Sequence, residues 1–137
     1  MKNLNKMFEN RKAFLAYLTA GDGGFDYCLD AFSALIDSGI DGLEIGMPFT
    51  DPIADGPIIQ AAMQRALSTG ANQQTVLALG HALRRKSVIP MILFTYYNPL
   101  LQAGPDYLHQ LAAAGFNGVL VNDLPLEEIE PHLKNMA

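Results

Sequence analysis

The sequence predicts an α/β protein built from consecutive parallel βα units. Short apolar segments alternate along the chain with longer segments of helical periodicity, as in parallel βα folds. The short segments are apolar throughout, which is typical of strands covered on both faces. The junctions GIDGLEIG (39–46) and GFNGVLVN (115–122) share one pattern, and a repeated junction favours a barrel over a doubly wound sheet. We therefore expect a (β/α)8 TIM barrel, of which residues 1–137 hold roughly the first four βα units as the amino-terminal half of one domain.

The first elements follow from apolar spacing and from the glycines that end each segment. A short amphipathic helix is expected around residues 4–8, and a buried strand over 13–19 that the turn AGDGG ends. The clearest helix runs over 25–36, where apolar side chains recur at helical spacing, and Gly39 ends it.

The later elements are bounded in the same way. Pro57 suits the first turn of a helix and Gly70 its end. The segments expected after the first helix pair are a strand over 41–46, helices over 57–70 and 73–86, a strand over 88–97, a helix over 104–115, a strand over 118–122 and a last helix over 126–136.

Composition excludes several classes of function. The formal charge of −5 argues against a nucleic-acid surface, which needs clustered lysines and arginines. The single cysteine, Cys28, excludes an internal disulfide and a Cys-based zinc site, and we expect no metal. No apolar run approaches the ~20 residues of a membrane span, and the amino-terminal end lacks a signal-peptide core. These features predict a cytoplasmic protein that binds no membrane.

The stretch LEIGMPFTDPIADGP (43–57) places a carboxylate inside an apolar strand. Alternation puts Leu43 and Ile45 on one face and Glu44 on the other, with a glycine on each side of it. Glu44 is therefore expected to point into the barrel near the carboxyl end of its strand, where barrel enzymes keep their chemistry. Apolar walls disfavour the charged carboxylate, so Glu44 is a candidate general acid. The alternative is that a lysine or arginine pairs with it.

The loop that follows is stiff and acidic. Pro48, Pro52 and Pro57 restrict its backbone, and it carries Asp51 and Asp55 four positions apart. Such a loop at the mouth of a barrel can hold a carboxylate in one place. The alternative for both aspartates is a cap or turn role before the helix that starts near Pro57.

The segment LEIGMPFTDPIADGPIIQ resembles the signature of the tryptophan synthase alpha chain family, and FLAYLTAGD, FTYYNPLL and VNDLPLEE extend the resemblance over nearly the whole sequence. The resemblance implies a (β/α)8 barrel that cleaves indole-3-glycerol phosphate to indole and glyceraldehyde 3-phosphate in tryptophan biosynthesis. It implies no metal or organic cofactor, because the indole ring itself delocalises the charge.

The resemblance also implies roles for single residues. Glu44 and Asp55 correspond to the two catalytic carboxylates. Tyr17, Phe94, Tyr96 and Val121 correspond to walls of the substrate pocket, with plain core packing as the alternative for the aromatic side chains. Pro48, Asp51 and Asn98 correspond to contacts with the beta subunit, which carries pyridoxal phosphate and forms a heterotetramer of two alpha and two beta subunits.

Two residues depart from the pattern that is usual in this family. A glycine stands where a proline often follows Asp22, and Asn122 stands where a smaller residue is usual.

A complete barrel takes about 250 residues, and its phosphate site follows strands seven and eight. This sequence therefore holds the acid–base residues without the phosphate site or the mobile lid. The alternative to an enzyme is a non-catalytic partner that binds and activates the beta subunit. Another phosphosugar barrel enzyme is disfavoured by the acidic loop.

Overall fold

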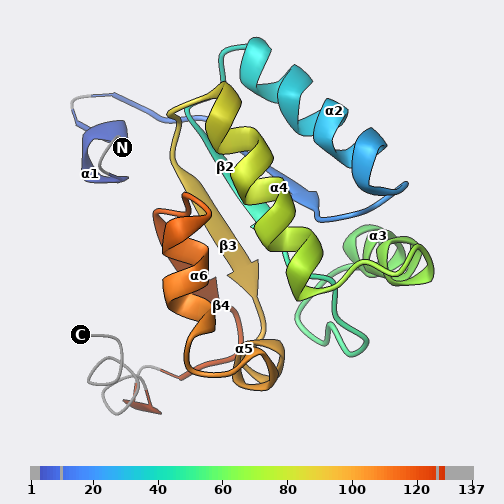
Figure 1. Ribbon diagram of the computed structural model, residues 1–137. Coiled ribbons are helices and arrows are strands. Elements are labelled where there is room, and N and C mark those ends of the chain that lie inside the picture. Colours follow the sequence, from blue (N-terminus) through green and yellow to red (C-terminus); the bar gives the residue numbers. More distant parts are fainter. Residues whose placement is uncertain (1–3, 10, 126, 129–137) are drawn as a thin grey trace.

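A parallel sheet of four strands in the order β1-β2-β3-β4 organises the chain. The computed structural model describes residues 4–9, 11–125 and 127–128 (Figure 1). Its elements are α1 (Leu4–Met7), β1 (Leu15–Thr19), α2 (Phe25–Asp37), β2 (Gly42–Gly46), α3 (Pro57–Ser68), α4 (Gln73–Lys86), β3 (Met91–Thr95), α5 (Tyr97–Ala103), α6 (Tyr107–Ala113) and β4 (Gly118–Val121). The predicted alternation of parallel strands and helices is confirmed.

The helices α2, α4 and α6 cover one face of this sheet (Figure 1). Leu43, Ile45 and Leu93 point into the layer between the sheet and these helices and are fully buried. Phe32 of α2 and Leu79 of α4 meet them from the helix side in the same core cluster. Burial of each such side chain contributes about 2 kcal/mol to stability. Because side chains alternate along a strand, burying this apolar face places the intervening residues on the opposite face.

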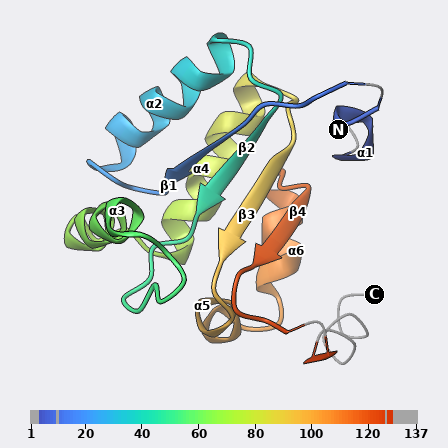
Figure 2. The ribbon, with the colours of Figure 1, turned by 180° about the vertical axis from the view of Figure 1, so that it is seen from behind.

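The opposite face carries no helix over its middle in the described part of the chain (Figure 2). Residues paired across parallel strands share a face, so Tyr17, Glu44 and Ile92 form one row on this open face. At the amino-terminal ends of the strands, α1 packs against this open face. A Cβ at Gly42 would lie 2.9 Å from Sδ of the buried Met7, so the glycine leaves room for this methionine side chain.

The junction repeat seen in the sequence is a repeated set of hydrogen bonds. Asp41 donates its backbone N–H to the Phe14 carbonyl (2.9 Å) and accepts the Phe14 N–H at Oδ2 (2.9 Å). Asn117 does the same with Met91, at 2.8 Å to the carbonyl and 3.1 Å at Oδ1. Each junction thus aligns the start of its strand with the preceding strand, which sets the parallel register.

Several element boundaries differ from the expectation. The third strand spans Met91–Thr95 rather than 88–97, because Pro90 has no N–H to donate and the chain turns into α5 at Tyr97. The helix α5 was not predicted, since FTYY reads as a continuation of the strand. The helix expected over 104–115 is shortened to Tyr107–Ala113. The helix expected over 126–136 lies outside the described residues except for 127–128.

Candidate functional site

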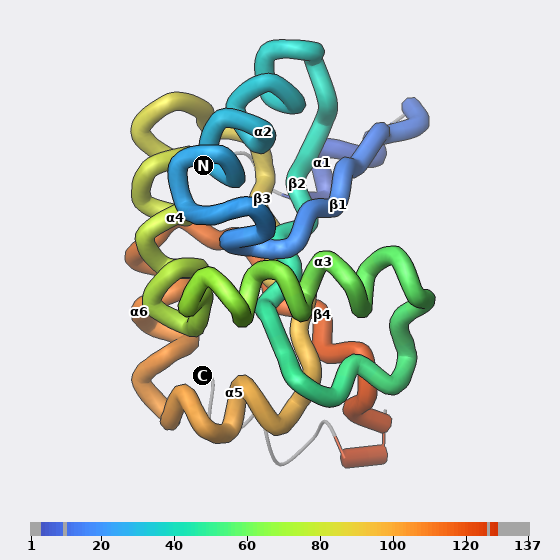
Figure 3. The backbone as a smooth tube through the Cα atoms, turned by 90° about the vertical axis from the view of Figure 1, so that its right-hand side faces the viewer, coloured from blue at the N-terminus to red at the C-terminus, as the bar shows by residue number. Residues whose placement is uncertain are grey.

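The carboxyl ends of the strands, the β2–α3 loop, α3 and α5 gather at one end of the molecule (Figure 3). Glu44 lies on the open face of β2, paired in register with Tyr17 of β1 and Ile92 of β3, and is half-buried. The predicted direction of its side chain therefore agrees with the register. The ion pairs between described residues are Arg11–Asp41 and Arg65–Asp22. Neither involves Glu44, so the alternative of a basic partner gains no support there.

Asp55 is held by a tyrosine from the next strand's end. The Tyr96 hydroxyl donates to Asp55 Oδ2 at 2.8 Å and accepts the backbone N–H of Ala54 at 2.9 Å. Tyr96 is 1% exposed, and its ring packs on Phe49 at a centroid distance of 5.3 Å. The capping alternative for Asp55 is wrong, because Gly56 is the N-cap of α3 and no side chain caps that helix.

Burial raises the pKa of both Tyr17 and Tyr96. For Tyr96 the hydrogen bond to Asp55 adds to this effect, because it favours the protonated phenol beside a carboxylate. For Tyr17 burial is the main cause, the hydrogen bond with Thr19 opposes it, and the negative charges of Asp55 and Glu44 raise the pKa further. Tyr17 thus lies within electrostatic reach of both carboxylates, and both phenols are neutral near pH 7.

Gly46 makes room for this arrangement. A Cβ on Gly46 would collide with the Tyr17 hydroxyl, so the ring of Tyr17 lies across the end of β2. Phe94, paired with Gly46 in register, meets that ring edge-on at 5.5 Å. The expected pocket walls Tyr17 and Phe94 therefore lie together on the open face beside Glu44.

Val121 is placed differently. It pairs with Thr95, and alternation along β3 puts Thr95 on the face of Leu93, which the helices cover. Val121 therefore does not share the face of Glu44, and its role as a pocket wall stays a prediction that the register does not support.

The predicted partner contacts lie around a separate hollow. Pro48, Asp51 and Asn98 line a cavity of about 460 Å³ between the β2–α3 loop, the α3–α4 turn and α5. Pro48 is buried, whereas Asp51 and Asn98 are exposed. Neither Glu44 nor Asp55 lines this cavity, so the structure separates the predicted interface from the predicted catalytic pair.

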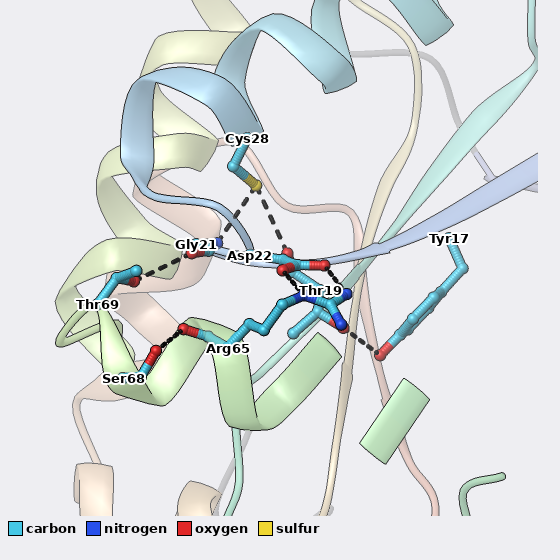
Figure 4. A network of polar contacts seen from close by, with 8 residues as sticks. All are labelled: Tyr17, Thr19, Gly21, Asp22, Cys28, Arg65, Ser68 and Thr69. Carbon is cyan, nitrogen blue, oxygen red and sulfur yellow. Dashed lines mark hydrogen bonds and ion pairs between the residues drawn. The ribbon is translucent and has the colours of Figure 1, made fainter. Parts of the chain in front are cut away.

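The loop after β1 is fastened to α3 (Figure 4). Arg65 donates from Nε and Nη2 to the two oxygens of Asp22, both at 2.7 Å. Thr69 donates to the Gly21 carbonyl at 3.1 Å, and the buried Cys28 accepts the Gly21 N–H at 3.2 Å. These contacts fix the turn that follows Thr19. The sequence offered no signal for them, because Asp22 and Arg65 lie 43 positions apart.

Among the described residues, no group of three or more His, Cys, Asp or Glu could hold a metal ion. Each helix in that part of the chain is too short or too polar to cross a membrane.

A parallel βα sheet with two carboxylates at its carboxyl end defines the class of (β/α)-barrel proteins that bind their ligands at the strand ends. The chain belongs to the tryptophan synthase alpha chain family, whose profile matches residues 2–137. The tryptophan synthase alpha chain of Chlamydia caviae is 56% identical over 128 residues, and that of Coxiella burnetii is 50% identical over 133 residues.

Solved structures agree with this membership. The alpha subunit from Legionella pneumophila superimposes with a TM-score of 0.88 at 39% identity, covering 96% of this chain and 52% of that one. A tryptophan synthase a2b2 complex from Pyrococcus furiosus gives 0.85 at 38% identity, covering 90% and 50%. The matched part is 93% of this chain and 50% of the Chlamydia protein, and 97% and 52% for the Coxiella protein. The chain thus spans about half the length of its relatives.

Proposed function

We propose that this chain supplies the acid–base half of a site that cleaves indole-3-glycerol phosphate to indole and glyceraldehyde 3-phosphate. The observation that carries the proposal is that Glu44, on the open face of β2, and Asp55, on the loop that follows β2, both lie within electrostatic reach of Tyr17. The proposal includes a location in the cytoplasm and a single barrel domain, of which residues 1–137 form the amino-terminal half.

The reaction is a retro-aldol cleavage that these two carboxylates can support. Glu44 donates a proton to ring carbon C3, and the Asp55 carboxylate stabilises the resulting positive charge through the ring N–H. The bond between C3 and the side-chain carbon then breaks, and its electron pair restores the indole ring. The hydroxyl on the departing carbon loses its proton to the Glu44 carboxylate and becomes the aldehyde. No metal or organic cofactor takes part in these steps.

We further propose that Pro48, Asp51 and Asn98 contact a beta subunit. Their support is that all three residues line one hollow beside the β2–α3 loop. The exposed Ile53, at 84%, lies on the same loop. An apolar side chain beside an exposed carboxylate suits a protein interface with an apolar centre and a polar rim.

The experiment tests the proposal in a barrel that is completed from two separate chains. The chain is mixed with the separately produced carboxyl-terminal half of the Chlamydia caviae relative, and indole release from indole-3-glycerol phosphate is measured. Glu44→Gln keeps the size of the side chain and removes the acidic proton. We expect it to lower the rate by about 10²–10⁴-fold, the usual contribution of a general acid, with an unchanged circular dichroism spectrum. A Glu44→Gln assembly that releases indole at the unsubstituted rate would overturn the assignment.

A further inference from the structure

We propose that Tyr96 acts as a positioning residue that orients the Asp55 carboxylate toward the N–H of an indole ring. This inference rests on the proposed function of Asp55 and adds to it one residue outside the acidic loop.

The hydroxyl of Tyr96 bonds to two groups of the β2–α3 loop. A phenol offers one donor and two acceptor positions. The backbone N–H of Ala54 donates to its oxygen at 2.9 Å. Because that N–H can only donate, the hydroxyl proton is free for Asp55 Oδ2, which lies at 2.8 Å.

The consequence is a fixed carboxylate with one oxygen in use. Burial raises the pKa of Tyr96 and the hydrogen bond to Asp55 raises it further, so the phenol keeps the proton that it donates. Asp55 is thereby held as an acceptor through Oδ2, and Oδ1 receives no hydrogen bond from the described residues that the structure shows. That second oxygen is the one we assign to the ring N–H.

The anchor itself is rigid. Tyr96 is 1% exposed and follows β3 directly, and Asn122 follows β4 with its backbone N–H on the Thr95 carbonyl at 2.8 Å. Strand ends place a functional side chain more reproducibly than a loop does. The β2–α3 loop therefore takes the position of Asp55 from the end of β3.

The test uses the full 137-residue chain, diluted until sedimentation shows a monomer, and two probes, indole and 1-methylindole, which lacks the N–H. Because the sequence has no tryptophan, indole fluorescence reports binding directly. We expect the chain to prefer indole, and Tyr96→Phe to lower this preference roughly tenfold, the worth of one charge-assisted hydrogen bond. The control Tyr27→Phe, at a side chain 70% exposed on α2, should leave it unchanged.

The outcomes separate the two proposals. If Asp55→Ala keeps the preference for indole, the proposed function of Asp55 fails. If Asp55→Ala removes the preference and Tyr96→Phe keeps it, only the positioning role is overturned. If the chain binds neither probe, amide hydrogen exchange at Ala54 decides. We expect Tyr96→Phe to speed that exchange at least about tenfold, and an unchanged rate overturns the positioning role.

Discussion

Asp51 and Asp55 lie on one loop, but their carboxylates have different surroundings. Asp51 is exposed, accepts a hydrogen bond from Thr50 and lines the outer hollow. Asp55 is half-buried and bonded to Tyr96. In the completed barrel described above, we expect Asp55→Ala to lower indole release by about 10²–10³-fold, with or without beta subunit. Asp51→Ala should be near normal alone and impaired only when the beta subunit is present. An Asp51→Ala assembly that is equally impaired in both conditions would contradict this division.

Cys28 links stability to pH. Burial raises the pKa of its thiol above the value in the unfolded chain. Folding therefore favours the protonated thiol, and this contribution is present below the unfolded pKa of about 8.5 and is lost as pH rises through the folded pKa. We expect the free energy of unfolding to fall more steeply above about pH 8.5 in the wild-type chain than in Cys28→Ser, which cannot ionise there. Urea unfolding at a series of pH values checks this, and parallel slopes would contradict it.

At the residue scale, the sequence could predict which face of the sheet a side chain occupies, but not which distant residue a side chain contacts. Strand alternation was sufficient to place Glu44 on the open face. The bond between Tyr96 and Asp55 joins residues 41 positions apart, and no periodicity or motif connects them. Resemblance named both residues without showing that one holds the other.

At the scale of elements, α4 shows what a cap contributes. Asn72 Oδ1 accepts the N–H of Gln74 at 2.9 Å and that of Thr75 at 3.4 Å, while Thr75 Oγ1 accepts the Asn72 N–H at 3.1 Å. This capping box satisfies backbone donors that the first turn leaves unpaired. We expect Asn72→Ala to lower the free energy of unfolding by about 1 kcal/mol. The exposed neighbour Gln74→Ala, which leaves the cap intact, should change it by less than about 0.5 kcal/mol. Equal losses in urea unfolding would contradict the capping role.

The carboxyl end of α4 makes contacts with other elements that a sequence pattern cannot predict. The run 84–86 is basic, which by itself indicates only a favourable charge at a helix end. In the structure the Arg84 guanidinium is half-buried, and burial lowers its pKa. It donates to the carbonyls of Ile89 (2.9 Å) and Gly115 (3.2 Å from Nε), so it ties together the junctions before β3 and β4. Helical periodicity predicted the helix, and only the tertiary arrangement determines this use of its last turn.

At the scale of the whole molecule, the sheet has one covered face and one open face. Among the described residues, β1 and β4 each pair on one side alone. The open face presents Tyr17, Ile92 and Phe94 half-buried, and Leu120 is 39% exposed. The alternation of βα units predicted the parallel sheet and its helix-covered face, and the open face follows because the chain holds four βα units rather than the eight of a closed barrel.

Unpaired parallel edges and an apolar face favour association. We therefore expect the 137-residue chain by itself to form dimers or larger species that cover the open face, with sedimentation velocity as the measurement. Since a barrel of this kind binds phosphate after strands seven and eight, we also expect no indole release from indole-3-glycerol phosphate by the chain alone. Leu120→Lys would place a charge on the open face of an edge strand, so it should shift the chain toward the monomer, whereas Val88→Lys, at a site 60% exposed before β3, should not. A stable monomer of the unsubstituted chain that releases indole would contradict both expectations. The open face would then not drive association, and the residues of this chain would suffice for cleavage.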